Sequence, residues 1–295
     1  MEIGDWPSTR DLNELYREIR ARGLEPKLAE LDAFGFTTIE GALGPDLVKR
    51  LRAAILQVAE ERHGRRLDLD REQELSGVDF VPYLLFRDPA FEEVLLNPGP
   101  LALVTYLLGR SCVLSSLGSH VKGPGGRPLA LHSDTANGAP APFPPFSQVC
   151  NCNYALTDYR EEAGALAVVP GSHRWARQPT RHELALDGPQ RNPDAIALEV
   201  PAGTAIVWHG NTWHGSFARR VPGLRINLSA YFCRQNIQPQ ENYRDHVPAA
   251  ALARHRDQPR FATLVGLDTH YGWTAEGPDW EKNARNRRAG TSWHA

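Results

Sequence analysis

The chain has 295 residues, and its 33 basic and 35 acidic side chains leave a formal net charge of −2. This balance offers no basic field for a nucleic acid or an anionic membrane, and no apolar run approaches the roughly 20 residues that span a bilayer. The acidic N-terminus does not resemble a secretory signal, and four cysteines do not make a disulfide framework, so we expect a cytoplasmic protein.

The first part of the chain is predicted to be mostly helical. Residues 34–39 (Phe-Gly-Phe-Thr-Thr-Ile) form the exception and indicate a strand. Residues 46–61 place apolar side chains at helical spacing, and Pro45 precedes them where a missing N–H costs nothing. Residues 101–108 predict a second, apolar helix that ends at Gly109.

From about residue 111 the pattern changes to short β-prone runs separated by Gly- and Pro-rich turns. These runs are residues 112–117, 147–156, 166–169, 205–208 and 224–232. Several short strands between turns are typical of a sandwich or barrel, and helices do not alternate with them as in a Rossmann sheet. We expect one domain over residues 1–295, with a helical part to about 110, a β core over about 111–235 and an extension over about 236–295.

The motif His132-Ser133-Asp134 is the central observation. In an extended segment, residues two apart project to the same side, so this imidazole and this carboxylate converge on one point. With eleven histidines in the chain, one such triplet is nearly expected by chance. A second occurs at His255 and Asp257, within residues 249–257, which we predict to be helical. Positions two apart face opposite sides of a helix, so we expect that copy to be a solvated helix face.

A second histidine ligand has to come from elsewhere, and residues 208–216 offer His209 and His214. His209 precedes Gly210 and is expected to enter a turn. His214 opens the run that follows. Together with His132 and Asp134 it would form a facial triad of two histidines and one carboxylate, which leaves three metal positions open and suits iron(II) oxygenases.

Arg225 follows the turn Val221-Pro222-Gly223, whose Pro-Gly pair fits a type II turn. If this turn pairs Arg225 with an even-numbered residue of the preceding strand, Arg225 faces the same side as His214 and Ser216; an odd-numbered partner would break that agreement. A buried arginine needs a carboxylate, and a dicarboxylate co-substrate would supply one in a bidentate pair. Two alternatives stay open: His214 could be a histidine of the hydrophobic core, and Arg225 could form an ordinary salt bridge.

These residues, together with one longer motif, resemble the phytanoyl-CoA dioxygenase family of iron(II)/2-oxoglutarate oxygenases. The motifs are His132-Ser133-Asp134, residues 164–173 (Gly-Ala-Leu-Ala-Val-Val-Pro-Gly-Ser-His), residues 213–216 (Trp-His-Gly-Ser) and Arg225, and the match spans about 34–243. The resemblance implies a mainly β, double-stranded β-helix (jelly-roll) core with helices outside. It also implies Fe(II) bound by His132, Asp134 and His214.

The same resemblance implies that Arg225 and Ser216 bind 2-oxoglutarate and that O2 is consumed. Asn153 stands where better-known members carry a tryptophan, and it would hydrogen-bond the co-substrate instead. Residues 170–173 are expected to form a structural turn, without a catalytic role for His173. Halogenases of the family have a small residue in place of the carboxylate ligand, so Asp134 argues against halogenation.

The implied reaction hydroxylates an unactivated C–H of a small molecule and releases succinate and CO2. The small molecule would be a lipid or acyl compound or a secondary metabolite. Two alternatives remain: a cupin-like metal enzyme without 2-oxoglutarate, and a non-catalytic jelly-roll binding protein. The sequence does not specify the substrate or the oligomeric state.

Three further features lie near the metal motif. In the loop 122–128, Lys122 and Arg127 are expected to be solvated rather than to bind an anionic substrate. The loop 138–147, with Phe143 and Phe146 among prolines, either lines the substrate pocket or is a plain surface connection. Cys150 and Cys152 are too close together for a usual zinc pair and are expected to be small buried hydrophobes.

Overall fold

The computed structural model describes residues 7–268, 273–282 and 284. The helices are α1 (Pro7–Ala21), α2 (Glu25–Phe34), α3 (Pro45–His63), α4 (Pro89–Leu95), α5 (Pro98–Leu108), α6 (Ala249–Arg254) and α7 (Pro259–Leu264). The strands are β1 (Phe36–Ile39), β2 (Val78–Val81), β3 (Val113–Lys122), β4 (Leu129–His132), β5 (Val149–Ala155), β6 (Leu166–Val168), β7 (Ile196–Ala197), β8 (Ala205–His209), β9 (His214–Ser216), β10 (Asn227–Cys233), β11 (Trp273–Thr274) and β12 (Gly277–Pro278). Within these ranges, no helix has both the length and the apolar character needed to cross a membrane.

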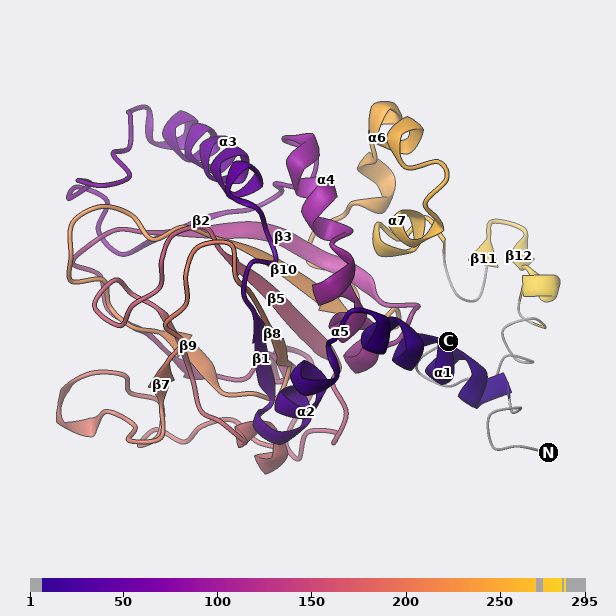
Figure 1. The fold of residues 1–295 in the computed structure, drawn as a ribbon, viewed down its shortest axis with the longest axis horizontal. Helices are drawn as coiled ribbons and strands as arrows, with labels where there is room; N and C mark the ends of the chain where they lie inside the picture. Colours follow the sequence, from indigo (N-terminus) through magenta and orange to yellow (C-terminus); the bar gives the residue numbers. More distant parts are fainter. Residues whose placement is uncertain (1–6, 269–272, 283, 285–295) are drawn as a thin grey trace.

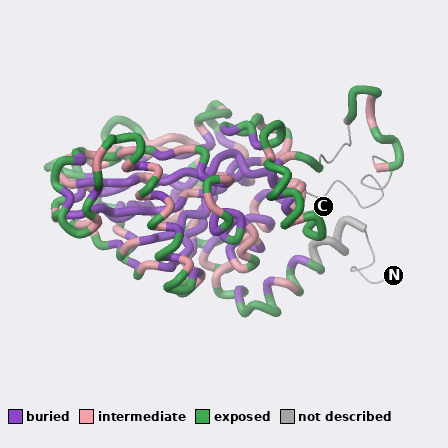
Figure 2. Tube along the Cα trace, turned by 90° about the horizontal axis from the view of Figure 1, so that it is seen from above, coloured by how far each residue is buried: buried purple, intermediate pink, exposed green. Residues whose placement is uncertain are grey.

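Two antiparallel sheets form the body of the protein. The larger has the strand order β1-β8-β5-β10-β3-β2, and the smaller has the order β4-β9-β6-β7. Figure 1 shows α3, α4 and α5 on one side of the larger sheet, with β7 and β9 on the other side. Figure 2 shows buried residues running through both sheets, while exposed residues concentrate in the outer loops. This arrangement confirms the predicted jelly roll with helices packed outside.

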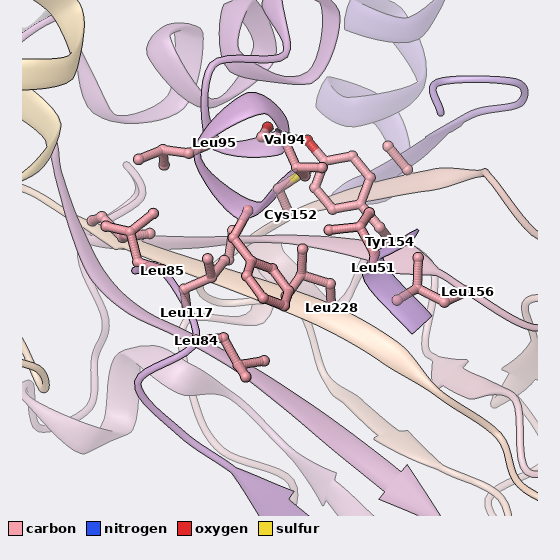
Figure 3. Packing of buried hydrophobic residues seen from close by; sticks show 14 of the residues in the cluster. Leu51, Leu84, Leu85, Val94, Leu95, Leu117, Cys152, Tyr154, Leu156 and Leu228 are labelled. Atoms are coloured by element: carbon pink, nitrogen blue, oxygen red, sulfur yellow. Dashed lines mark hydrogen bonds between the residues drawn. The ribbon is translucent and has the colours of Figure 1, made fainter. Parts of the chain in front are cut away.

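The strands of the larger sheet alternate between an apolar face and a polar face. On β5, Cys150, Cys152 and Tyr154 belong to the main hydrophobic core under the helices. Figure 3 shows Cys152 and Tyr154 beside Val94 of α4. The intervening side chains point the other way, toward the smaller sheet. The polar face of the larger sheet is therefore available to line a site between the two sheets.

Most of the predicted elements are present with small shifts at their ends. The helices predicted at 46–61 and 101–108 are α3 and α5, and the strand predicted at 34–39 is β1. The expected cysteine environment is also found, because all four thiols are free and buried. The strands β2 and β4 were not predicted, since each is only four residues long and is flanked by loop-forming residues.

The turn Val221-Pro222-Gly223 does not pair Arg225 with the strand that carries His214, so the expected pairing is wrong. His214 and Ser216 lie on β9 in the smaller sheet, whereas β10, which follows the turn, belongs to the larger sheet. Arg225 pairs instead with Lys122, through two backbone hydrogen bonds of 2.8 and 2.9 Å. A Pro-Gly pair specifies a change of chain direction, and it leaves open which sheet receives the next strand.

The interpretation of the second His-x-Asp motif is also only partly correct. Helix α6 ends at Arg254, and His255 caps it rather than lying on a solvated face. The His255 ring is largely buried and its Nε2 lies 2.7 Å from a carboxylate oxygen of Glu92. Asp257 is exposed and pairs with Arg256, so this copy brings no two metal ligands together.

Candidate metal centre and co-substrate cavity

The three predicted metal ligands lie close together at one end of β4 and β9 in the smaller sheet. His132 ends β4 and is paired in register with His214, the first residue of β9. One ligand atom each from His132, Asp134 and His214 lies within 4.8 Å of the others. The Asp134 carboxylate oxygens lie 3.8 Å from Nε2 of His132 and 3.5 Å from Nε2 of His214. Their chemistry and spacing suit a ferrous ion bound by two nitrogens and one oxygen.

Backbone carbonyls set the orientation of both imidazoles. Nδ1 of His132 lies 2.9 Å from the carbonyl oxygen of Ala130, and Nδ1 of His214 lies 3.0 Å from that of Thr212. Because a carbonyl only accepts, each Nδ1 carries the proton and each Nε2 keeps its lone pair for a metal. Burial lowers the pKa of His214 to about 4, which favours the neutral form that a metal ligand requires.

Asn151 holds the carboxylate of Asp134. Its Nδ2 donates to Oδ2 of Asp134 at 2.7 Å, and its own Oδ1 accepts from the Ser229 hydroxyl at 3.1 Å. Asn151 on β5 and Ser229 on β10 both lie on the polar face of the larger sheet, opposite β9 of the smaller sheet. The hydrogen bond to Oδ2 fixes the orientation of the carboxylate beside the two imidazoles.

The turn at residues 170–173 supports β9 just before His214. The Ser172 hydroxyl accepts from the backbone N–H of Trp213 at 2.9 Å, and the Val169 N–H donates to the Trp213 carbonyl at 2.9 Å. His173 points away, with Nε2 3.2 Å from the Asp32 carbonyl oxygen. The geometry is that of the structural turn expected from the sequence.

His209, the other candidate in residues 208–216, does not join the triad. It ends β8 and enters the expected turn, in which the Thr212 N–H donates to the His209 carbonyl at 2.9 Å and the Asn211 N–H donates to its Nδ1 at 3.0 Å. Its neighbour Trp208 lies closer to the site, with ring centroids of Trp208 and His214 4.9 Å apart.

All six residues predicted for the site line one cavity of about 380 Å³. The metal triad is accompanied there by Ser216 from β9, Asn153 from β5 and Arg225 from the segment before β10. Oδ1 of Asn153 accepts from Nδ2 of Asn227 at 2.8 Å, so its own amide nitrogen is left for another partner.

Two buried cations lie close to Ser216: Arg225, which lines the cavity, and Lys122, which contacts Ser216 from within the protein. Arg225 donates from Nε to the Gly164 carbonyl at 3.1 Å and lies over the Tyr159 ring, 5.3 Å from its centroid. The Lys122 ammonium donates to the Ser216 hydroxyl at 2.8 Å and to the Phe217 carbonyl at 2.5 Å. In the described part of the chain, neither cation forms an ion pair with an acidic side chain.

The expectation that Lys122 is solvated is therefore wrong, although Arg127 is exposed as expected. The backbone pairing with Arg225 turns the Lys122 side chain into the protein, where it is fully buried. Burial, and then the charge of Arg225, lower the pKa of Lys122 to about 7. The Tyr159 hydroxyl is buried nearby, and none of the residues that the structure describes forms a hydrogen bond with it. These donors together form a cradle suited to an anion.

Sequence reasoning missed Asn151, Trp208 and His120, which line the cavity, and Lys122, which contacts its wall through Ser216. The run Cys150 to Tyr154 did contain a usable signal, because its polar and apolar residues alternate with the strand period. Because the apolar residues of this strand face the helices, Asn151 and Asn153 must face the opposite side, where the site lies. No comparable local signal marks Lys122, since its position depends on a partner more than 100 residues away.

The loop 138–147 forms a packed connection outside the cavity. Phe143 is buried, with its backbone N–H donating to the Ala176 carbonyl at 2.8 Å. Phe146 lies under the guanidinium of Arg234, 5.3 Å from its ring centroid. Neither phenylalanine lines the cavity, whose nearest contribution from this region is Asn137.

Comparison with known proteins gives a consistent result. A family model described as phytanoyl-CoA dioxygenase (PhyH) matches residues 31–227. Dioxygenase af480 of Aspergillus fumigatus is 31% identical over 199 residues, which are 67% of this chain and 61% of that protein, so the match spans less than two thirds of the relative. Dioxygenase trt7 of Aspergillus terreus is 26% identical over 83% of this chain and 85% of its own.

Solved structures share the fold at low identity. HygX from Streptomyces hygroscopicus, with nickel and 2-oxoglutarate bound, has a TM-score of 0.60 at 16% identity and covers 77% of this chain and 93% of its own. The non-heme alpha ketoglutarate dependent carbocyclase SnoK has a TM-score of 0.54 at 22% identity, with coverages of 71% and 83%. These similarities show the jelly-roll fold. Because the family model matches well over half of the sequence, the chain belongs to the phytanoyl-CoA dioxygenase family.

Proposed function

We propose that the protein is an iron(II)- and 2-oxoglutarate-dependent oxygenase acting on a small molecule. One observation carries the proposal: the facial triad and the buried guanidinium of Arg225 line the same cavity, and Lys122 contacts its wall through Ser216. Among the described residues, neither cation pairs with an acidic side chain. A triad alone is compatible with many metal enzymes. The buried cations add a requirement for an anion that reaches the metal, which a 2-oxo dicarboxylate meets.

In this proposal His132, Asp134 and His214 hold the metal, and Asn151 keeps Asp134 in place. When bound, iron(II) and 2-oxoglutarate supply O2 activation coupled to release of succinate and CO2. Arg225 binds the far carboxylate of the co-substrate through its guanidinium, and Ser216 is held by Lys122 in position to add a hydrogen bond. The apolar walls exclude bulk water from the reacting atoms and orient the substrate.

Hydroxylation of an unactivated C–H is the outcome that we propose. The carboxylate of Asp134 occupies the position that halogenases leave open, so halide transfer is not expected. The solved structures that share this fold include a carbocyclase and an epimerase, so the product has to be identified directly. Mass spectrometry of the product tests this point, because an added oxygen atom supports hydroxylation, whereas ring closure or inversion contradicts it.

Anaerobic titration with Fe(II) and then 2-oxoglutarate tests the reaction class. The chelate is expected to give a weak visible charge-transfer band in the wild-type protein. Asp134→Ala should lose the band because it loses iron, while Arg225→Ala should keep iron and require at least about tenfold more 2-oxoglutarate. Iron binding without the band would favour a cupin-like enzyme that does not use 2-oxoglutarate. A folded protein that binds neither would favour a non-catalytic binding protein.

A further inference from the structure

The mouth of the cavity lies between the edge strands of the two sheets. β2 is the last strand of the larger sheet and β4 is an edge strand of the smaller one. Val78 and Phe80 on β2 and Leu129 on β4 line the cavity, yet they are 42%, 43% and 48% exposed. Side chains that contact both the cavity and solvent form its rim, so the rim is apolar where the two edges face each other.

The position of Phe80 is built into the sheet. Phe80 is paired with His120, and their ring centroids are 4.9 Å apart. The ring also covers Gly118, because a Cβ at that position would lie only 2.8 Å from it. Any larger residue at 118 would displace the ring from the cavity wall. The glycine and the phenylalanine therefore form a complementary pair, and the apolar rim is more than a chance exposure of single side chains.

Among the residues that the structure describes, the cavity lining offers a substrate no charged group beyond those that the metal and the co-substrate would use. Asp134 and Arg225 are the acidic and basic side chains that line it, apart from histidines. His120 is kept neutral, because burial lowers its pKa to about 4. The acidic residue between the two rim positions of β2, Asp79, pairs with Arg62 and His63 instead of lining the cavity.

The remaining polar lining is neutral. Ser116, Asn137, Ser229, Tyr231 and Gln240 provide hydroxyl and amide groups near the rim and walls. Such groups form hydrogen bonds with hydroxyl or carbonyl groups of a ligand. They do not neutralise an ionic group, which loses its hydration when it enters an apolar site.

We propose that the substrate is an uncharged, largely apolar small molecule with a few hydrogen-bonding groups, selected by the apolar rim of Val78, Phe80 and Leu129. This inference rests on the proposed function, because it assigns Asp134 and Arg225 to the metal and the co-substrate. It disfavours acyl-CoA esters, whose phosphates would require cations at the rim, and it selects the neutral members of the substrate classes expected from the sequence.

A set of ligands that share one skeleton tests the inference. 1-Adamantanemethanol, 1-adamantanecarboxylate and 1-adamantanemethylammonium differ mainly in charge at pH 7. Each is titrated into the anaerobic complex with Fe(II) and 2-oxoglutarate, and binding is followed by calorimetry and by the shift of the charge-transfer band. The alcohol is expected to bind at least about tenfold more tightly than either ion, since the ions lose hydration without gaining a partner.

Charged variants of the rim should change this order. Phe80→Lys is expected to improve binding of the carboxylate relative to the alcohol by at least about tenfold, and Leu129→Lys should do the same if the Phe80 variant does not fold. Leu252→Lys on α6 is the matched control, because Leu252 is 43% exposed and does not line the cavity. It should leave the order unchanged.

Three results would overturn the proposal: an ion that binds the wild type as tightly as the alcohol, an alcohol that does not bind up to its solubility limit, or rim variants that leave the ratio unchanged. Failure of the proposed function is seen separately and earlier. In that case the charge-transfer band is missing before any adamantane compound is added.

Discussion

At the scale of single residues, the site depends on side chains that do not touch the metal position themselves. Asn151 is the clearest example, because it joins Ser229 on the larger sheet to the carboxylate of Asp134. Hydrogen bonds of this kind fix a ligand in one orientation before the metal arrives.

Asn151→Leu should therefore weaken iron binding while the fold persists. We expect the Kd for Fe(II) to rise about 10- to 100-fold, the range typical for loss of a partner of a metal ligand. Anaerobic calorimetry measures it. Asn153→Leu is the matched control two positions along the same strand face, and it should affect 2-oxoglutarate more than iron. Equal iron affinities for Asn151→Leu and the wild type would contradict the role assigned to Asn151.

Lys122 gives a prediction about pH. Its pKa is about 7 in the folded protein and 10.5 in the unfolded chain, so the unfolded state binds more protons between these values. The penalty for burying Lys122 is therefore full below pH 7 and declines as the pH rises toward 10.5. Without co-substrate, the difference in Tm between the wild type and Lys122→Met should shift in favour of the wild type by at least about 2 °C when the pH is raised from 7 to 9.5. A constant difference across that range would contradict this.

At the scale of elements, the loop between α3 and β2 positions Arg225 from outside the sheets. Glu72 organises this loop, because its carboxylate accepts from Arg65 at 2.8 and 3.0 Å and from the backbone N–H groups of Leu75 and Glu74. The loop in turn accepts backbone hydrogen bonds from Gly223 and Leu224, just before Arg225. A surface loop thus determines where the chain crosses from one sheet to the other.

The pKa of Glu72 is lowered to about 2, first by the hydrogen bond from Arg65. Stability from this group is present above the unfolded pKa of 4.5 and is lost as the pH falls toward 2. Glu72→Gln should lower the free energy of unfolding by about 2 kcal/mol at pH 7, and by less at pH 3. Urea unfolding measures both values. Glu74→Gln, in the same loop but with an exposed carboxylate, should cost less than about 1 kcal/mol. Equal losses at both pH values would show that Glu72 acts through packing instead.

At the scale of the whole molecule, ligands that bind the folded state alone should stabilise it. With Ni(II) as a redox-inert metal and 2-oxoglutarate, each at about 100 times its Kd, binding contributes about 2.7 kcal/mol per ligand. The Tm should rise by several degrees with both present, as differential scanning fluorimetry would show. Arg225→Ala should keep the rise from Ni(II) and lose the increment from 2-oxoglutarate. An unchanged increment would mean that the buried cations do not bind the co-substrate.

The parts of this molecule that could be predicted from sequence are those with local causes. Period and caps predicted α3 and α5, and the two-residue spacing of a strand predicted that His132 and Asp134 converge. The positions of Lys122 and Arg225 depend on pairing between segments far apart in the sequence, which local patterns do not report. The rim was missed for a similar reason, since β2 is too short to show a period and its exposed apolar residues have meaning only opposite β4.

The crossing of the chain at Val221-Pro222-Gly223 has a mechanical consequence. It puts His214 and Arg225 in different layers of the sandwich, although they are near neighbours in sequence. In the proposed function, a dicarboxylate bound at one end by the guanidinium and at the other by the metal on His214 would link the two layers. Amide hydrogen exchange should therefore slow in β9 and in β10 together when the dicarboxylate binds. Separation of the two layers for product release would then require both ends of the dicarboxylate to dissociate.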